Sequence, residues 1–271
     1  MINISILTIN YNNASGLKCT LESINKQKLP SGFIYELIIV DGLSSDESLD
    51  IIQKYTPIVD TLICEKDNGI YDAMNKGISH ANGQYLLFLN SGDYFSTPDA
   101  FEIINSRLKT EKNNNKVIFW PVKNITESGD YWYFPKKNIK NIKLWLKNNV
   151  PNHQAMLFPK AFYSYNKYNL EYKIASDLDY KYRCMQNFDS SFINESITNF
   201  SIGGVSSSPL DFNKYQIILK DSYLFYDSHY HGLSKQINKS IVTIKFSIKL
   251  LISYFLKNYY IHIIRKIKGY K

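Results

Sequence analysis

The first half of the chain alternates short apolar runs with stretches in which apolar residues recur every three or four positions. The strand-like runs cover residues 4–9, 36–40, 59–64 and 84–89, and helical spacing follows over 17–24, 45–55 and 70–80. The run at 36–40 is nearly continuous in apolar residues, as in a sheet that is covered on both faces. This alternation predicts an α/β fold with a mostly parallel sheet flanked by helices.

The second half of the chain is less regular. Strand-like runs at 117–122 and 154–158 flank a predicted hairpin turn at 127–130, which leads into the aromatic run 131–134. Ser45 and Ser176 are each placed to cap a helix, the second of which reaches about residue 186. From residue 233 the apolar positions recur at helical spacing, so the pattern predicts a domain at 1–227 and a helical tail at 228–271.

Composition limits the class of protein. The chain has 271 residues, of which 44% are hydrophobic, so it can bury a large core and is not disordered as a whole. Its three cysteines lie far apart without a CxxC motif, which excludes a disulfide scaffold and suits a reducing compartment. We expect neither a signal peptide nor a membrane-spanning run, and therefore a cytoplasmic protein.

The net charge of +8 belongs to the tail. Residues 228–271 hold nine Lys and Arg and no Asp or Glu, whereas the rest of the chain has 23 basic and 24 acidic residues. A helix with one apolar row and separate lysines is suited to lie on an anionic membrane surface. We predict that the tail contacts a membrane, with a helix packed on the first domain as the alternative.

Polar residues cluster where the predicted strands end. Asn10–Asn12 follow the first strand, Asp41 the second, Asp67 and Asn68 the third, and Asn90–Asp93 the fourth. Ligands of open α/β sheets bind beyond the carboxyl ends of the strands. Grouped carboxylates favour Mg²⁺ or Mn²⁺, and such an ion commonly also holds a diphosphate. The set predicts a nucleotide site, although each cluster alone is also ordinary turn chemistry.

Four stretches together resemble family 2 glycosyltransferases of the GT-A fold. They are SILTINYN at 5–12, IIVDGLSSD at 38–46, EKDNGIYDAMNKGI at 65–78 and GQYLLFLNSGD at 83–93. The resemblance extends over residues 3–206, and it is specific as a combination. It points to the subgroup that builds colanic-acid-like and other bacterial surface polysaccharides, and it implies a Rossmann-like sheet.

The resemblance also implies which residues hold the donor. The nucleoside positions of the family match Thr8, Tyr11 and Asp41, and its nucleotide-sugar site matches Asp67, Asn68 and Asn75. The metal-binding DxD region matches Asn90–Asp93, in which Asp93 keeps the only carboxylate and would bind Mg²⁺ or Mn²⁺. Asn90 would lie near the ribose or the diphosphate.

The catalytic base that the resemblance implies is Asp177. Residues 174–180 match the Glu-Asp-x-Asp motif of the family, with Ser176 in place of Glu. An inverting transfer needs a carboxylate to take the proton of the acceptor hydroxyl. A carboxylate that only favours the start of a helix is the alternative, and Asp179 is the second candidate. His153 would lie beside the acceptor or the diphosphate, or be structural.

Two further groups allow two interpretations each. Residues 203–206 (GGVS) would form an active-site loop of backbone donors or a plain turn. The aromatic residues Trp120, Tyr131, Trp132 and Tyr133 would stack on sugars or belong to the core.

The predicted function is therefore an inverting hexosyltransferase that uses a nucleotide sugar, UDP-linked rather than GDP-linked. Its acceptor would be a lipid-linked oligosaccharide in the synthesis of O-antigen, capsule or another surface polysaccharide, at the inner face of the cell membrane. A nucleotidyltransferase is one alternative, but the segment after Ile9 lacks a glycine-rich phosphate loop. A nucleic-acid-binding module that uses the tail is another, but it leaves the acidic clusters unexplained, and we expect no nucleic-acid partner.

Overall fold

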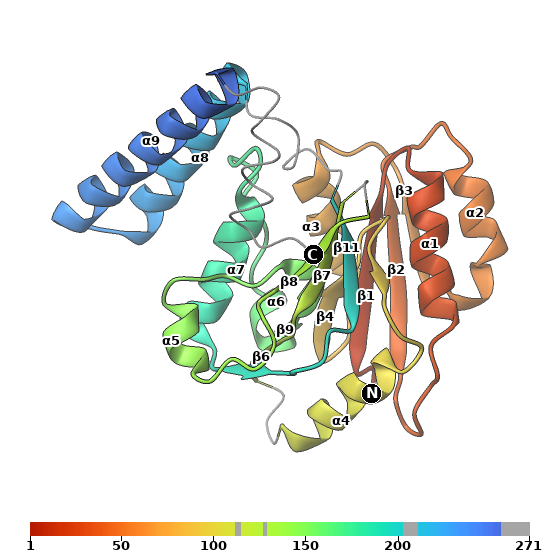
Figure 1. Cartoon of the computed structure of the whole chain (residues 1–271). Coiled ribbons are helices and arrows are strands. Elements are labelled where there is room, and N and C mark those ends of the chain that lie inside the picture. The colour runs from red at the N-terminus through yellow and green to blue at the C-terminus, as the bar shows by residue number, and fades with distance from the viewer. Residues whose placement is uncertain (112–114, 127–128, 203–210, 256–271) are drawn as a thin grey trace.

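A seven-stranded sheet forms the centre of the computed structural model, which describes residues 1–111, 115–126, 129–202 and 211–255 (Figure 1). The strands follow the order β10 (Ser190–Phe192), β6 (Val117–Phe119), β9 (Met156–Pro159), β4 (Tyr85–Phe88), β1 (Ile4–Asn10), β2 (Tyr35–Asp41) and β3 (Thr61–Cys64). β4, β1, β2 and β3 are parallel, which confirms the predicted α/β class. β9 runs antiparallel between β4 and β6, and β10 runs parallel to β6.

Helices cover both faces of this sheet. One face packs against α1 (Ala14–Asn25), α2 (Ser48–Lys54) and α4 (Ala100–Thr110), and the other against α3 (Ile70–His80), α6 (Lys160–Tyr163) and α7 (Ser176–Asn187). Successive residues of β1 alternate between the faces, because Ile6 faces the first set of helices and Leu7 the second. α3 lies so close to β1 that a Cβ at Gly77 would come within 2.1 Å of the Leu7 side chain. The two covered faces account for the continuous apolar runs in the sequence.

A smaller sheet stands beside the central one, in the order β5 (Tyr94–Phe95), β11 (Thr198–Ser201), β7 (Val122–Ile125) and β8 (Tyr131–Phe134). β7 and β8 pair antiparallel, which confirms the predicted hairpin. The predicted single strand at 117–122 is wrong, since β6 and β7 belong to different sheets. The chain changes sheets at Trp120 and Pro121, where Pro has no N–H to continue a strand ladder.

Two long helices, α8 (Phe212–His229) and α9 (Gly232–Phe255), lie side by side and project from the rest of the molecule (Figure 1). α9 confirms the helix that the sequence predicts from residue 233. α8 was not predicted, and it runs through the expected domain boundary after residue 227. The hydroxyl groups of Tyr223 and Thr243 lie 2.8 Å apart and join the two helices.

Candidate active site

A cleft of about 1090 Å³ lies beyond the carboxyl ends of the parallel strands. Its walls come from the start of α1, the start of α3, the turn after β4, the segment before β9, the start of α7 and the end of β11. The lining brings together four of the predicted site residues: Asn90, Asp93, His153 and Asp177. The other six predicted residues, Thr8, Tyr11, Asp41, Asp67, Asn68 and Asn75, are not part of this lining.

Asp177 lies in the first turn of α7 and faces two basic side chains. Its Oδ2 atom is 2.9 Å from Nζ of Lys181, one helical turn further on, and 3.8 Å from Nδ1 of His153. Lys181 is almost fully buried, with 7% of its surface exposed. The carboxylate therefore stands in the cleft between a cation and an imidazole, and it remains partly accessible from the cleft.

The surroundings of Asp177 set its protonation state. Burial alone favours the neutral acid, but the charge of Lys181 and the contact with His153 outweigh it and hold the pKa of Asp177 well below its usual range. Burial also lowers the pKa of His153, although the neighbouring Asp177 opposes this shift. At neutral pH the cleft therefore presents a deprotonated carboxylate and a neutral imidazole, and such a carboxylate can accept a proton.

Among the described residues that line the cleft, the second carboxylate is Asp93, in the turn after β4. Asp93 is 4% exposed, and burial raises its pKa well above the usual value, despite hydrogen bonding to Gln154 and Asn90. The amide nitrogen of Asn90 lies 3.4 Å from Nε2 of His153, and its buried Oδ1 atom has no hydrogen-bond partner. A buried carboxylate and an unpaired amide oxygen are both oxygen donors that a hard divalent cation accepts, so these residues fit such an ion.

The expectation that several carboxylates share one site is not met. Within the described ranges, no three His, Cys, Asp or Glu side chains lie close enough together to hold a metal ion. The reason is the burial of Asp41, whose Oδ2 accepts hydrogen bonds from Asn10 Nδ2 at 2.7 Å and Ser44 Oγ at 2.8 Å. Its Oδ1 accepts from the backbone N–H of Ser44 at 2.7 Å. Asp41 is 0% exposed, so its carboxylate is not accessible to a metal ion and instead stabilises the loop after β2 through these hydrogen bonds.

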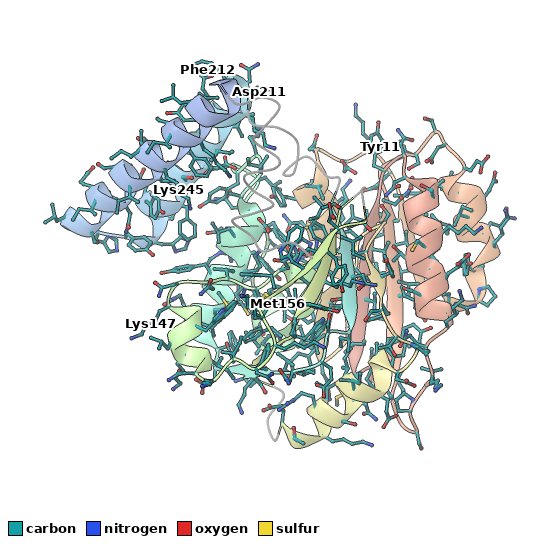
Figure 2. All side chains as sticks on the ribbon, in the orientation of Figure 1. Tyr11, Lys147, Met156, Asp211, Phe212 and Lys245 are labelled. Carbon is teal, nitrogen blue, oxygen red and sulfur yellow. The ribbon has the colours of Figure 1, made fainter. Side chains whose placement is uncertain are left out.

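Tyr11, predicted to hold the nucleoside, and Asp67, predicted for the nucleotide-sugar site, lie next to each other and are at least partly accessible. Tyr11 is 64% exposed and stands at the upper edge of the sheet in Figure 2. A Cβ added to Gly42 would approach the Tyr11 ring at 3.1 Å and Oδ2 of Asp67 at 2.6 Å, so both side chains flank this glycine. Tyr11, Gly42 and Asp67, which we call the strand-end rim, form a second polar group outside the cleft lining.

The remaining predicted residues hold the scaffold together. Thr8 is 0% exposed and donates to the carbonyl of Leu89 at 2.8 Å, which ties β1 to the end of β4. Asn75 donates to the carbonyl of Tyr168 at 2.9 Å and accepts from its N–H at 2.8 Å. Asn68 is exposed, and its backbone N–H donates to Asp72 at 2.9 Å at the start of α3.

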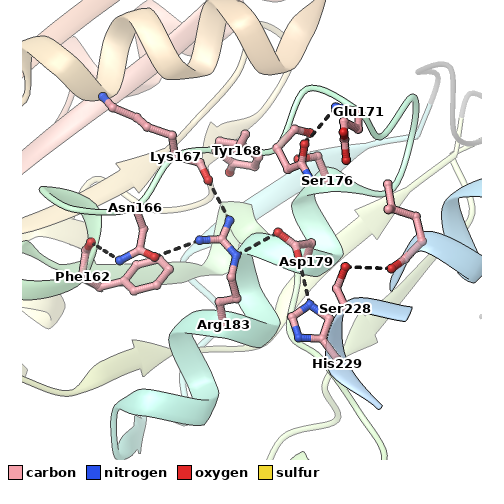
Figure 3. A network of polar contacts seen from close by, with 12 residues as sticks. Phe162, Asn166, Lys167, Tyr168, Glu171, Ser176, Asp179, Arg183, Ser228 and His229 are labelled. Atoms are coloured by element: carbon pink, nitrogen blue, oxygen red, sulfur yellow. Dashed lines mark hydrogen bonds and ion pairs between the residues drawn. The ribbon is translucent and has the colours of Figure 1, made fainter. Parts of the chain in front are cut away.

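Asp179, the second candidate base, belongs to a different network (Figure 3). One of its oxygens lies 2.9 Å from Nε of Arg183 and the other 2.7 Å from Nε2 of His229. Arg183 also donates to the carbonyl of Lys167 and to Asn166. Because His229 is the last residue of α8, this network binds α8 to α7. Asp179 is thus engaged in structure and is absent from the cleft lining.

A carboxylate from a distant helix holds the segment immediately before α7. Ser176 does not cap the helix as predicted, since its hydroxyl donates to the carbonyl of Asn169 at 2.8 Å. The carboxylate of Asp221 on α8 instead accepts backbone N–H groups from Lys173, Ile174 and Ala175, at 2.8 to 3.2 Å. Asp221 is 1% exposed, so α8 fixes the segment immediately before Asp177.

Ser45 likewise does not cap α2. Its N–H donates to Oδ1 of Asn12 at 2.8 Å, while Asp46 accepts from the N–H of Ser48, where α2 begins. The loops after β1 and β2 are thereby tied together next to the strand-end rim.

Sequence reasoning missed Lys181 and Tyr71 as cleft residues. Asp177 and Lys181 are four residues apart, the usual spacing of an ion pair on a helix. This spacing could have predicted from the sequence that Lys181 lies beside Asp177. Tyr71 stacks on Tyr168 with ring centres 5.5 Å apart, and burial raises its pKa. The predicted glycine loop at 203–206 lies outside the described residues.

Proteins of similar sequence carry glycosyltransferase names. The PGL/p-HBAD biosynthesis glycosyltransferase of Mycobacterium bovis is 29% identical over 218 residues, which cover 78% of this chain and 81% of the relative. The putative teichuronic acid biosynthesis glycosyltransferase TuaG of Bacillus subtilis is 34% identical over 93 residues, which cover 33% of this chain and 36% of TuaG.

Solved structures share the fold at low sequence identity. S. aureus TarS 1–349 in complex with UDP-GlcNAc matches with a TM-score of 0.66 and 17% identity, over 96% of this chain and 75% of TarS 1–349. The mannosyltransferase PcManGT from Pyrobaculum calidifontis, in complex with GDP-Man and Mn²⁺, matches with a TM-score of 0.60 and 10% identity, over 93% and 75% of the two chains. The family model "Glycosyl transferase family 2" matches residues 5–166, more than half of the sequence. With this match and the GT-A architecture, the chain belongs to glycosyl transferase family 2.

Proposed function

We propose that this glycosyltransferase is an inverting hexosyltransferase that extends a lipid-linked oligosaccharide during the synthesis of a bacterial surface polysaccharide. The observation that carries the proposal is the position of Asp177, a deprotonated carboxylate that lines the same cleft as Asn90 and Asp93. The named functions of the relatives, PGL/p-HBAD and teichuronic acid biosynthesis, support the assignment to envelope glycans.

In the proposed reaction Asp177 acts as the general base. Its carboxylate takes the proton of an acceptor hydroxyl while that oxygen forms a bond to the anomeric carbon of the donor sugar. The bond from the anomeric carbon to the nucleoside diphosphate breaks on the opposite face, and the diphosphate leaves with the electron pair. Assistance of this kind contributes about 10²- to 10⁴-fold in rate. Lys181, whose Nζ atom lies 2.9 Å from Oδ2 of Asp177, fixes the position of the carboxylate in the cleft.

Asp177→Asn tests this assignment. The amide is nearly isosteric but cannot accept the proton, so transfer should fall by about 10² or more while UDP binding persists. Asp50→Asn, at an exposed position on α2, is the matched control and should transfer sugar at the rate of the unmodified protein. Unchanged transfer by Asp177→Asn would remove Asp177 as the base, and transfer would then be compared in Asp179→Asn.

We further propose a UDP-linked rather than a GDP-linked donor, with Tyr11 and Asp67 of the strand-end rim contacting the nucleoside. TarS was solved with UDP-GlcNAc and with UDP, which supports this choice, whereas PcManGT was solved with GDP-Man. The two rim side chains are accessible and lie beyond strands β1 and β3, where nucleotides bind in sheets of this kind.

A divalent cation, Mg²⁺ or Mn²⁺, belongs to the proposal as well. Asp93 and the unpaired Oδ1 of Asn90 are the residues that would hold it, and when bound it offsets negative charge on the donor diphosphate. A structural neighbour that contains Mn²⁺ supports this role. Removal of metal with EDTA should weaken UDP binding. If UDP binding is insensitive to EDTA, the proposed role of the cation is wrong, and the rest of the proposed function is unaffected.

The proposed membrane contact is the outer side of α9. The apolar residues there face away from α8 and are 49% to 76% exposed: Leu233, Ile237, Ile241, Ile244, Ile248 and Leu251. Lys245 and Lys249 lie beside this row and are exposed. An exposed apolar row with flanking lysines fits an anionic lipid surface, where the lipid-linked acceptor would also reside.

Part of the tail charge has a different role. Lys235 and Lys239 pair with Asp227 of α8, at 3.3 Å and 2.8 Å, so these two lysines bind α9 to α8. Five of the nine basic residues of the tail follow residue 255 and lie outside the described part of the chain. Within the described ranges no helix is long and apolar enough to cross a membrane. Contact at the inner face of the membrane, rather than insertion across it, is therefore proposed for α9.

A further inference from the structure

A second cleft, of about 960 Å³, lies beside the cleft that holds Asp177. It is built from the β7–β8 hairpin, the loop at 135–141 and α5 (Ile142–Leu146). Neither the proposed base nor the proposed donor residues line it. It is therefore a candidate binding site separate from the proposed donor and base residues.

The walls of this second cleft are aromatic. Trp132, Tyr133 and Phe134 of β8 and Trp145 of α5 all belong to the lining, and all four are only partly buried. Trp145 is held in place by Phe119, whose ring lies parallel to it at 5.8 Å, and by Phe134 at 5.6 Å. Trp120, in contrast, is 0% exposed and belongs to the core. Flat, partly exposed rings on a fixed support suit the apolar faces of sugar rings.

The rim of the second cleft is basic. Lys136, Lys137 and Lys140 line it and are exposed, and no Asp or Glu occurs between residues 131 and 170. Lys137 lies 5.3 Å from the centre of the Tyr133 ring. Within the described residues none of these three lysines forms an ion pair, so their charges are available to an anionic ligand.

The two clefts meet at Asn152, which lines both of them. Its side chain donates to Oδ1 of Asn124 in β7, the residue paired with Trp132 of β8, at 3.2 Å. The next residue is His153, which neighbours Asp177. A long molecule bound in the second cleft would thus have one end directed toward the proposed base.

We infer that the second cleft binds the growing glycan, and that this glycan is anionic. Its sugar rings would lie against Trp132 and Trp145, and its phosphate or carboxylate groups would pair with Lys136 and Lys140. The inference rests on the proposed function, because it names the acceptor that Asp177 would activate. It narrows that acceptor from any oligosaccharide to one that carries negative charge.

The test is a tryptophan fluorescence titration of the full chain. The probes are an oligogalacturonate, a glycerol-phosphate oligomer, a neutral malto-oligosaccharide and a single-stranded oligonucleotide of matched charge. Of the three tryptophans, Trp132 and Trp145 line the cleft, so occupancy should change their emission. We expect saturable binding of the galacturonate or the phosphate oligomer, and the tighter of the two identifies the anion. Binding should weaken as salt is added.

Two double variants of equal charge locate the ligand. Lys136→Ala with Lys140→Ala should weaken binding of the anionic oligomer about tenfold, since exposed pairs each contribute modestly. Lys143→Ala with Lys147→Ala removes the same charge from α5 and the residue after it, both outside the lining, and it should leave affinity within about twofold. Figure 2 shows Lys147 at the outer edge of the molecule.

Three results would overturn the inference. Equal losses in the two double variants would mean diffuse attraction rather than a site, and malto-oligosaccharide binding as tight as that of the charged oligomers would remove the role of charge. Tighter binding of the oligonucleotide would identify a nucleic-acid site instead. UDP binding, measured in the same samples, separates the two claims: if UDP binds and neither anionic oligomer does, this inference fails and the proposed function stands.

Discussion

At the scale of single residues, Asp177 and Lys181 form the interaction on which the proposed chemistry depends. Lys181 is 7% exposed, so replacing its carboxylate partner leaves a buried ammonium group without a counter-charge. We predict that Asp177→Asn lowers the free energy of unfolding by about 1–3 kcal/mol at pH 7, measured by urea denaturation.

The same pair gives a pH dependence with a definite sign. Lys181 and His153 hold the pKa of folded Asp177 below that of the unfolded chain, so its contribution is fully present above about pH 5. That contribution is lost as the pH falls toward the folded pKa. The stability difference between the unmodified protein and Asp177→Asn should therefore shrink from pH 6 to pH 3. A constant difference would show that the charge of Asp177 does not stabilise the fold.

We expect Asp41 to have a structural role and Asp67 to contact the nucleotide, and substitutions at the two positions distinguish these roles. Asp41 is buried and accepts three short hydrogen bonds, so Asp41→Asn places an amide N–H₂ group against existing donors. We predict a loss of about 1–3 kcal/mol in the free energy of unfolding. Asp67→Asn, at the accessible rim, should cost less than about 0.5 kcal/mol and weaken UDP binding instead. The reverse outcome would assign the nucleoside contact to Asp41.

At the scale of elements, α8 connects the tail to the catalytic helix. Asp221 accepts three backbone N–H groups just before α7, and His229 contacts Asp179. We predict that Asp221→Ala lowers the free energy of unfolding by about 1–3 kcal/mol. It should also lower the rate of transfer, because Asp177 follows directly after the segment that Asp221 holds. Asp50→Ala, at an exposed position on α2, is the control and should change neither by much. Equal effects of the two substitutions would contradict a positioning role for Asp221.

The sequence predicted those elements that are marked by residues within or next to them, and it did not predict features that depend on residues far apart in the chain. The parallel strands and α3 were correctly predicted, because apolar runs and turn residues next to them mark them directly. α8 was missed, and so were the hydrogen bonds that Asp221 accepts from the segment before α7, which lies 46 to 48 residues away along the chain. Asp41 was correctly placed at a strand end, but only the fold shows that Asn10 and Ser44 enclose it.

At the scale of the whole molecule, the exposed apolar row of α9 leads us to expect that the protein binds to anionic membranes. We predict that the full chain sediments with phosphatidylglycerol vesicles and less with phosphatidylcholine vesicles. Ile241→Ser, Ile244→Ser and Ile248→Ser together should reduce sedimentation strongly and leave UDP binding unchanged, since these side chains are exposed. Undiminished sedimentation of the triple variant would place the contact elsewhere in the protein.

We propose that the cleft beyond the parallel strands holds a nucleotide-sugar donor next to Asp177, and calorimetric titration of the full chain with UDP and Mn²⁺ decides this. We expect saturable binding of one UDP per chain, weakened by Asp93→Ala and by EDTA and unchanged by Asp177→Asn. If neither UDP nor GDP binds, with or without metal, the cleft is not a nucleotide-sugar site.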